Sequence, residues 1–321
     1  MADVEFVNTE YGKNWVRLLH IRRLGGKQQD VRELEVCTSL TLTSQKDYLH
    51  GDNSDIIATD TQKNTVYALA KTKGVTTPEQ FGLDLCHHFL SSFSHVTRVK
   101  VAVTMAPWRR MKTGGQDHAH AFIMTPDAVR FCNVEQARKG TPVVHAGLKD
   151  MKILKTTQSA FKGFIRDRYT SLPEVDDRCL ETVVYSRWKY ATLKGLDFDA
   201  AWNTAKSTIL EEFAGPPSTG VFSASVQKTL YDAECEILGR VPQVSTTVPY
   251  SVQKTLYDAE CEILGRVPQI TEIEMTMPNV HNFNVDLSKF GLDNKDEVLM
   301  PVDKPSGIIH AAIRRKTTAK L

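Results

Sequence analysis

The feature of this sequence that most restricts its fold is an order of segments that occurs twice along the chain. In each half, two strand-like segments precede two helix-like segments, and two further strand-like segments follow. Strands that flank a pair of helices are typical of an antiparallel sheet with helices on one face, which is an α+β fold. In the first half the strand-like segments are 12–21, 31–43, 96–105 and 119–124, and the helix-like segments are 60–73, capped by Thr59 or Asp60, and 78–93.

The second half has the same series, and turn residues cluster between Gly140 and Gly147. We therefore expect two units, residues 1–143 and 144–321, which also agrees with a length of 321 residues at about 150 residues per domain. In the second unit the strand-like segments are 143–155, 182–190, 272–277 and 283–287, and the helix-like segments are 198–213 and one that begins at Ser225 or Ser251.

A second feature is an identical repeat. Residues 225–243, with the sequence SVQKTLYDAECEILGRVPQ, recur without change at 251–269. Solenoid folds contain several diverged repeats and need about three of them for stability. Two identical copies therefore indicate a recent local duplication, and Cys235 and Cys261 are the same position in its two copies.

The composition excludes several classes of protein. Lys+Arg total 40 and Asp+Glu total 38, so the net charge of +2 gives no strong field for nucleic acid or an anionic membrane. No run approaches the roughly 18 apolar residues of a membrane-spanning helix. The six cysteines form no CxxC pair, which favours reduced thiols over a disulfide framework. We expect neither nucleic acid nor a membrane among the partners.

Few residues suggest chemistry when they are read one at a time. The chain has no Gly-rich phosphate loop, no P-loop and no GxSxG motif, which disfavours the common cofactor sites. His118 and His120 alternate on a strand and form either a metal pair or two hydrogen-bonded structural residues. No third ligand stands at a suitable spacing, so we favour the structural role and expect no metal. Read singly, Lys13 is typical of a surface charge and Arg178 of a salt-bridged surface residue.

Several blocks in a fixed order carry more information than any single residue. Together they resemble the urate oxidase (uricase) family, and the resemblance covers essentially the whole chain outside the duplication. The most specific block is LKTTQSAFKGFIRDRYTSLPEVDDR, from Leu154 to Arg178; the supporting blocks are Tyr11-Gly-Lys13-Asn, residues 51–64, Ser-Val-Gln-Lys-Thr-Leu-Tyr-Asp and Pro278-Asn-Val-His281.

The resemblance implies two tandem T-fold units per chain, each with the order ββααββ. It further implies a homotetramer whose antiparallel sheets form a barrel, with active sites where two subunits meet. The expected substrate is urate, held by the fork of Arg178 and the amide of Gln227 beneath the ring of Phe161. The full set of substrate-binding residues that the resemblance implies is Thr59, Asp60, Phe161, Arg178, Val226, Gln227 and Asn279.

For catalysis the resemblance implies a Lys13–Thr59 pair completed by His281, with Asn279 holding dioxygen or water. The implied reaction needs no cofactor and converts urate, dioxygen and water into 5-hydroxyisourate and hydrogen peroxide. Two alternatives remain open. The duplication could leave an impaired urate- or purine-binding protein of the same fold, and a T-fold enzyme acting on a pterin would use a metal at His118 and His120.

The duplication also makes the binding residues ambiguous. The first copy follows a family-like lead-in at 222–225, and the second copy precedes a family-like exit at 267–273. Since the binding groups lie at the start of the helix, we favour Val226 and Gln227 over Val252 and Gln253.

The last three residues, Ala319-Lys320-Leu321, differ from the peroxisomal Ser-Lys-Leu signal at one position. An enzyme that makes hydrogen peroxide is well placed in an organelle that contains catalase. We therefore expect recognition by the peroxisomal import receptor and a peroxisomal location.

Overall fold

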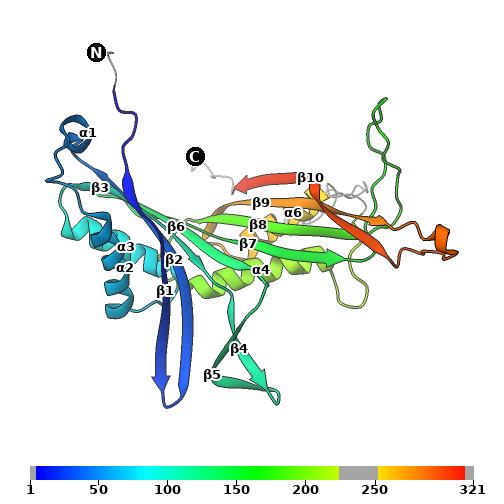
Figure 1. Cartoon of the computed structure of the whole chain (residues 1–321), viewed down its shortest axis with the longest axis horizontal. Coiled ribbons are helices and arrows are strands. Elements are labelled where there is room, and N and C mark those ends of the chain that lie inside the picture. The colour runs from blue at the N-terminus through cyan, green and yellow to red at the C-terminus, as the bar shows by residue number, and fades with distance from the viewer. Residues whose placement is uncertain (1–4, 224–251, 315–321) are drawn as a thin grey trace, which may run out of the picture. The chain divides into compact units, whose positions relative to one another are not determined.

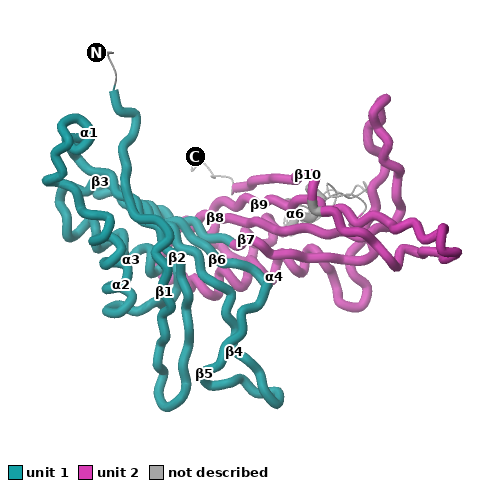
Figure 2. Tube along the Cα trace, in the orientation of Figure 1, with its two compact units in different colours: residues 1–147 teal, residues 148–321 magenta. Residues whose placement is uncertain are grey.

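The structure, a computed structural model, describes residues 5–223 and 252–314. The chain divides into two compact units, Met1–Gly147 and Leu148–Leu321 (Figure 2). The boundary expected from the turn residues lies a few residues earlier, between residues 143 and 144. Strand β7 (Val143–Lys155) contains both positions.

Unit 1 is an antiparallel sheet with two helices packed against it (Figure 1). Its helices are α2 (Thr59–Thr72), which packs on the first strand, and α3 (Pro78–Ser92), which packs on the last two strands. Proline at the first position of α3 and the hydroxyl of Thr77 at its cap start that helix. In order across the sheet the strands are β1 (Tyr11–Gly25), β2 (Gln28–Leu42), β3 (Val96–Met105) and β6 (Val129–Ala137).

One expected strand lies elsewhere. Residues 119–124 belong to β5 (Gln116–Met124), which pairs with β4 (Trp108–Thr113) in a separate two-stranded sheet. Gly114 and Gly115 both have positive φ and form the tight turn of this hairpin. The fourth strand of the main sheet, β6, was not expected. Alternation of apolar residues identifies a strand but not its partner, so the assignment of 119–124 to the main sheet was wrong.

Unit 2 has the same organisation, with helices α4 (Phe198–Ala214) and α6 (Val252–Arg266). The expected strands 272–277 and 283–287 are wrong as two elements, because β9 (Ile270–Asn284) runs without interruption through Pro278. Pro278 remains in register with Ile308 of a last strand that was not expected. The strand order in unit 2 is β7, β8 (Leu180–Tyr190), β9 and β10 (Leu299–Arg314). Each unit also has a short element, α1 (Lys46–His50) in unit 1 and η1 (Ser288–Phe290) in unit 2.

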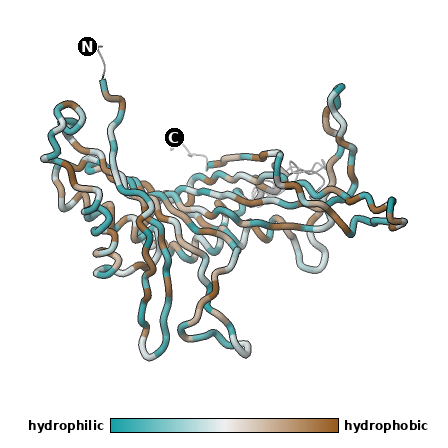
Figure 3. Tube along the Cα trace, in the orientation of Figure 1, coloured by the Kyte–Doolittle hydropathy of each residue, from teal (hydrophilic) through white to brown (hydrophobic). Residues whose placement is uncertain are grey.

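Each unit has its own hydrophobic core between sheet and helices. Apolar and polar residues alternate along the strands, so that one face of each sheet is buried (Figure 3). The order ββααββ in both units confirms the expected α+β T-fold. The largest fully buried side chains are Leu34, Leu40, Phe81, Leu85 and Phe89 in unit 1, and Leu148, Met151, Leu180, Trp188, Ile209 and Leu256 in unit 2.

The helix packed in unit 2 is the second copy of the repeat. Helix α6 packs on α4, β9 and β10, and it buries Leu256, Ala259, Ile263 and Leu264. Its exit turns directly into β9, where the N–H of Ile270 donates to the carbonyl of Val267. The first copy lies outside the described residues. No helix among residues 5–223 and 252–314 has the length and apolarity needed to cross a bilayer.

Candidate active site

Lys13 lies near the start of β1, paired in register with Thr38 of β2. The next pair in the ladder is Val16 with Val36, so a β-bulge directly follows the lysine. Trp15 in the bulge has φ of 56°, and its N–H donates to the Cys37 sulfur at 3.3 Å. Bulges bend a strand and redirect its side chains, and they are frequent next to active sites.

Thr59 and Asp60 are the first two residues of α2. The helix begins one residue earlier than expected, because Ala58 occupies the cap position and provides no side-chain hydrogen bond. The expectation that Thr59 or Asp60 caps the helix was therefore wrong. As a result, the Thr59 hydroxyl is not used as a cap, and the first N–H groups of α2 have no intrahelical acceptor. Such a helix start favours a bound anion.

The Asp60 carboxylate lies within the electrostatic reach of Lys13. It accepts hydrogen bonds from Lys63 at 2.6 Å and from Asn64 at 2.9 Å. The bond from Lys63 is the main cause that lowers the pKa of Asp60, and the positive charge of Lys13 also lowers it. The lysine of β1 and the start of α2 therefore belong to one local group of charges.

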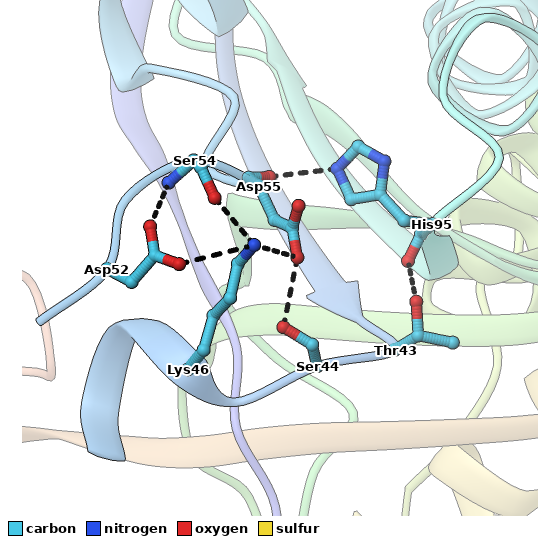
Figure 4. Close-up of polar contacts among 7 residues, drawn as sticks. All are labelled: Thr43, Ser44, Lys46, Asp52, Ser54, Asp55 and His95. Atoms are coloured by element: carbon cyan, nitrogen blue, oxygen red, sulfur yellow. Dashed lines mark hydrogen bonds and ion pairs between the residues drawn. The ribbon is translucent and has the colours of Figure 1, made fainter. Parts of the chain in front are cut away.

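The loop that leads to α2 is held by the ammonium group of Lys46 (Figure 4). This group lies 3.0 Å from Asp55 and 3.4 Å from Asp52, and it donates to Ser54 at 2.5 Å. Its hydrogen bond lowers the pKa of Asp55. The same loop is further fixed by the hydroxyl of Ser44, which donates to the Asp55 carboxylate, and by His95, whose ring nitrogen contacts the Asp55 carbonyl at 2.8 Å and whose own carbonyl accepts from Thr43.

Two further hydrogen bonds connect the start of α2 to the sheet. The N–H of Ile57 donates to the Tyr11 hydroxyl at 2.9 Å, two residues before Lys13 on the same strand. The hydroxyl of Thr38, which faces Lys13 across the ladder, donates to the buried Gln62 amide at 2.8 Å. These bonds fix the start of α2 relative to the start of β1.

Phe161 and Arg178 lie together in unit 2. The guanidinium carbon of Arg178 is 5.2 Å from the centroid of the Phe161 ring. The ring of Phe164 stacks on Phe161 at 4.8 Å with an interplanar angle of 15°. Backbone hydrogen bonds in both directions between Phe161 and Val175 hold the two ends of this loop side by side. The loop therefore presents an aromatic ring and a cation together.

Arg178 has no carboxylate partner among the described residues, although two aspartates precede it. Asp176 forms an ion pair with Lys162, and Asp177 accepts from the Thr157 hydroxyl at 2.5 Å. The Nε of Arg178 is buried without an acceptor, and burial lowers the pKa of the guanidinium. The interpretation of Arg178 as a salt-bridged surface residue was therefore wrong. An unpaired, partly buried guanidinium is a site for an anion.

His281 and Asn279 lie on β9. The pKa of His281 is lowered chiefly by burial and further by the charge of Arg178, which places the ring within the field of the guanidinium. Asn279 pairs with Thr182 on one side and with Gly307 of β10 on the other. Opposite these two residues the ladder is irregular, because His281 pairs with Val302 and residues 303–306 are unmatched.

The structure thus groups the predicted residues within each unit. Lys13, Thr59 and Asp60 belong to the group in unit 1, and Phe161, Arg178, Asn279 and His281 belong to unit 2. Val226 and Gln227 lie outside the described residues, whereas the identical Val252 and Gln253 are the first residues of α6.

His118 and His120 are adjacent, with ring centroids 4.7 Å apart. The Nδ1 of His118 accepts from the N–H groups of His120 and Ala121, the latter at 3.0 Å. No group of three metal-ligating side chains occurs among the described residues. The hydrogen bonds of His118 agree with a structural role for this pair.

Some residues near these groups were not predicted. Lys155 and Asp177 lie inside the block that carries the family resemblance, yet no spacing rule selects them. Their partners are backbone groups and hydroxyls of distant segments, such as the Ser223 hydroxyl 2.6 Å from the Lys155 ammonium. The sequence signal that could have drawn attention to Lys155 and Asp177 was their place in the block that carries the family resemblance. Their contacts are seen only in the folded chain.

Comparison with known proteins identifies the family of this chain and agrees with its fold. A sequence model described as Uricase matches residues 9–135, 144–249 and 246–310. Proteins named Uricase from Oryctolagus cuniculus and Danio rerio are each 50% identical over 319 residues, which is 99% of this chain and 97% and 98% of theirs. The chain belongs to the uricase family. A crystal structure of uricase from Arthrobacter globiformis, 34% identical, superposes with a TM-score of 0.82 and covers 98% of this chain and 96% of its own.

The match to the uricase family also reflects the duplication. The second and third matched segments overlap at residues 246–249, and each contains one complete copy of the repeat. Both copies therefore resemble the same uricase element, and one of them is surplus to the family fold.

Proposed function

We propose that this chain oxidises urate with dioxygen and water, and releases 5-hydroxyisourate and hydrogen peroxide. The observation that carries the proposal is the unpaired guanidinium of Arg178 beside the ring of Phe161, in a chain that belongs to the uricase family. A flat purine anion complements both groups, since the fork of an arginine matches carbonyl and nitrogen atoms on one edge while the ring stacks on the face.

Deprotonation of urate is assigned to Lys13, Thr59 and His281. Lys13 acts as the base that accepts the hydroxyl proton of Thr59, and Thr59 in turn takes a proton from bound urate through a water molecule. His281 completes the relay. The N–H groups at the start of α2 stabilise the negative charge that results.

The oxidation itself balances without a cofactor. The urate dianion is electron-rich and reduces dioxygen by two electrons, through a peroxide adduct on the ring. Both dioxygen atoms leave as hydrogen peroxide, and the oxygen of one water molecule becomes the new hydroxyl group of 5-hydroxyisourate. Asn279 holds dioxygen or water above the ring, and the protein contributes orientation and electrostatic complementarity.

The glutamine that binds the opposite edge of urate comes from one of the two copies. The sequence favours Val226 and Gln227, but the copy packed against the unit 2 sheet begins at Val252. A helix with a buried apolar face has a fixed start, which is what a binding group needs. We therefore assign the binding groups to Val252 and Gln253.

Assembly and location extend the proposal. Lys13 and Thr59 belong to unit 1, whereas Arg178 and His281 belong to unit 2, and a homotetramer with active sites between subunits would bring the two groups together. Mixing inactive Lys13→Met and Arg178→Gln chains should then restore part of the activity; no recovery would contradict shared sites. Ala319-Lys320-Leu321, outside the described residues, supports a peroxisomal location through the import receptor.

The proposal is tested by mixing the purified protein with urate under air. Dioxygen uptake, peroxide release and loss of the near-ultraviolet absorbance of urate should proceed together in a ratio of one to one to one. Binding of urate without turnover would instead indicate an impaired purine-binding protein. Loss of activity on treatment with a chelator would indicate a metal enzyme.

A further inference from the structure

Lys155, the last residue of β7, has a half-buried ammonium group with an unusual set of partners. It donates to the carbonyl of Val221 at 3.0 Å and to the hydroxyl of Ser223 at 2.6 Å. It also lies 5.5 Å from the centroid of the Phe213 ring. Among the described residues it forms no ion pair, so its bonds go to neutral acceptors of one short segment.

The segment that Lys155 binds runs beside the loop that leads to Phe161. The N–H of Ser223 donates to the carbonyl of Gln158 at 2.7 Å, and the N–H of Ala160 donates to the carbonyl of Ser223 at 2.8 Å. Phe161 is the next residue. Ser223 is thus paired with the loop residues just before Phe161, and Lys155 connects Ser223 to the end of β7, where that loop begins.

The carboxylate of Asp177 holds the other side of the same loop. It accepts from the Thr157 hydroxyl and from the N–H of Ser159 at 3.2 Å, and these bonds lower its pKa against the opposing effect of burial. Arg178 follows Asp177 directly. The loop thus has one charged anchor on each side, Lys155 towards Ser223 and Asp177 towards Arg178.

Burying a cation against neutral acceptors disfavours its charged form, and burial lowers the pKa of Lys155 to about 8. A surface lysine would avoid this cost. The burial has a geometric benefit, because hydrogen bonds from a charged donor are stronger than neutral ones and fix the segment they reach.

We propose that Lys155 is a positioning residue that fixes the ring of Phe161 for stacking on the substrate. This inference rests on the proposed function, because it assigns the lysine a role in binding the flat purine anion. It does not assign Lys155 a role in the oxidation step. Loss of the ammonium group should therefore weaken substrate binding and leave turnover of bound substrate nearly unchanged.

The test compares the variants Lys155→Met, Lys155→Arg and Ser223→Ala with the control Lys194→Met, which removes an exposed lysine between β8 and α4. Urate affinity is measured under nitrogen, and KM and kcat under air. Lys155→Met should weaken binding and raise KM about ten-fold or more, with kcat within about two-fold. Lys155→Arg should restore much of the affinity, since a guanidinium can donate to both acceptors. Ser223→Ala should have a smaller effect, and the control none.

Amide hydrogen exchange at Ala160 and Ser223 gives an independent measurement. Exchange at both amides should be faster in Lys155→Met and in Ser223→Ala, while amides of the β3 core stay protected. Unchanged exchange and unchanged affinity in Ser223→Ala and Lys155→Met would overturn the proposal, as would a loss confined to kcat. If the unaltered protein neither binds nor oxidises urate, the proposed function fails and the role in substrate binding fails with it, while the exchange data still decide whether Lys155 anchors the loop.

Discussion

The guanidinium carbon of Arg178 lies 5.2 Å from the centre of the Phe161 ring, and no carboxylate among the described residues neutralises it. The two aspartates that precede Arg178 in the sequence are engaged elsewhere. This relationship places a planar cation that lacks a carboxylate partner in the described part of the chain directly beside an aromatic ring. It also gives the binding proposal a direct test.

Replacing Arg178 with glutamine should weaken binding of urate about 100-fold, because the charge-assisted hydrogen bonds to the anion are lost. The measurement is the dissociation constant for urate under nitrogen. Arg166→Gln is the matched control, since Arg166 lies in the same block with its guanidinium 5.1 Å from the ring of Phe164. Equal effects of the two substitutions would remove Arg178 from the binding site.

Lys13→Met should leave urate binding nearly intact but lower kcat by about 10²–10⁴-fold, because the proton acceptor for Thr59 is lost. The checks are kcat under air and urate affinity under nitrogen. Lys71→Met removes an exposed lysine at the other end of α2 and should change neither value. Normal turnover in Lys13→Met would exclude the lysine from the mechanism.

The two copies of the repeat allow an internal comparison. Gln253→Ala should raise the dissociation constant for urate about ten-fold or more, since Gln253 lies at the start of the packed helix α6. Gln227→Ala, the same substitution in the first copy, should have little effect. The reverse result would assign the binding groups to the first copy, as the sequence favours.

Removal of 26 residues, 225–250, leaves one copy of the repeat between the family-like lead-in and exit. We expect a higher melting temperature, because a second amphipathic copy carries apolar side chains that the unit 2 core does not need. The loop-closure entropy of an insertion is small, so the gain should come mainly from this apolar surface. Thermal unfolding of the two proteins at equal concentration checks this, and an unchanged melting temperature would count against it.

Glu260 is fully buried on α6, and burial raises the pKa of its carboxyl from 4.5 to about 9. Between these two values the folded protein keeps a proton that the unfolded chain has released, so stability falls as the pH rises through this window. Glu260→Gln should therefore stabilise the protein at pH 8 and much less near pH 5. Melting temperatures across this range test the prediction, with Glu234→Gln, the same position in the first copy, for comparison. An equal gain at both pH values would contradict it.

The sequence determined the secondary structure of most of the chain, because the periods of helices and strands are local properties of side-chain placement. The Phe81, Leu85 and Phe89 spacing predicts α3, and the alternation of Val99, Val101 and Val103 predicts β3. The ordered motifs also identified the family and predicted which residues form the candidate site.

Only the tertiary structure decided which segments pair and which charges stay free. It placed residues 119–124 in a separate hairpin, continued β9 through Pro278, and packed the second of two identical copies as α6. It left Arg178 unpaired beside two aspartates and joined Lys155 to Ser223, 68 residues away. Which strands and which charged groups pair depends on distances between segments that are remote in sequence. Which of two identical copies packs depends only on the residues that precede and follow each copy. Local periodicity encodes neither the pairing nor the choice of copy.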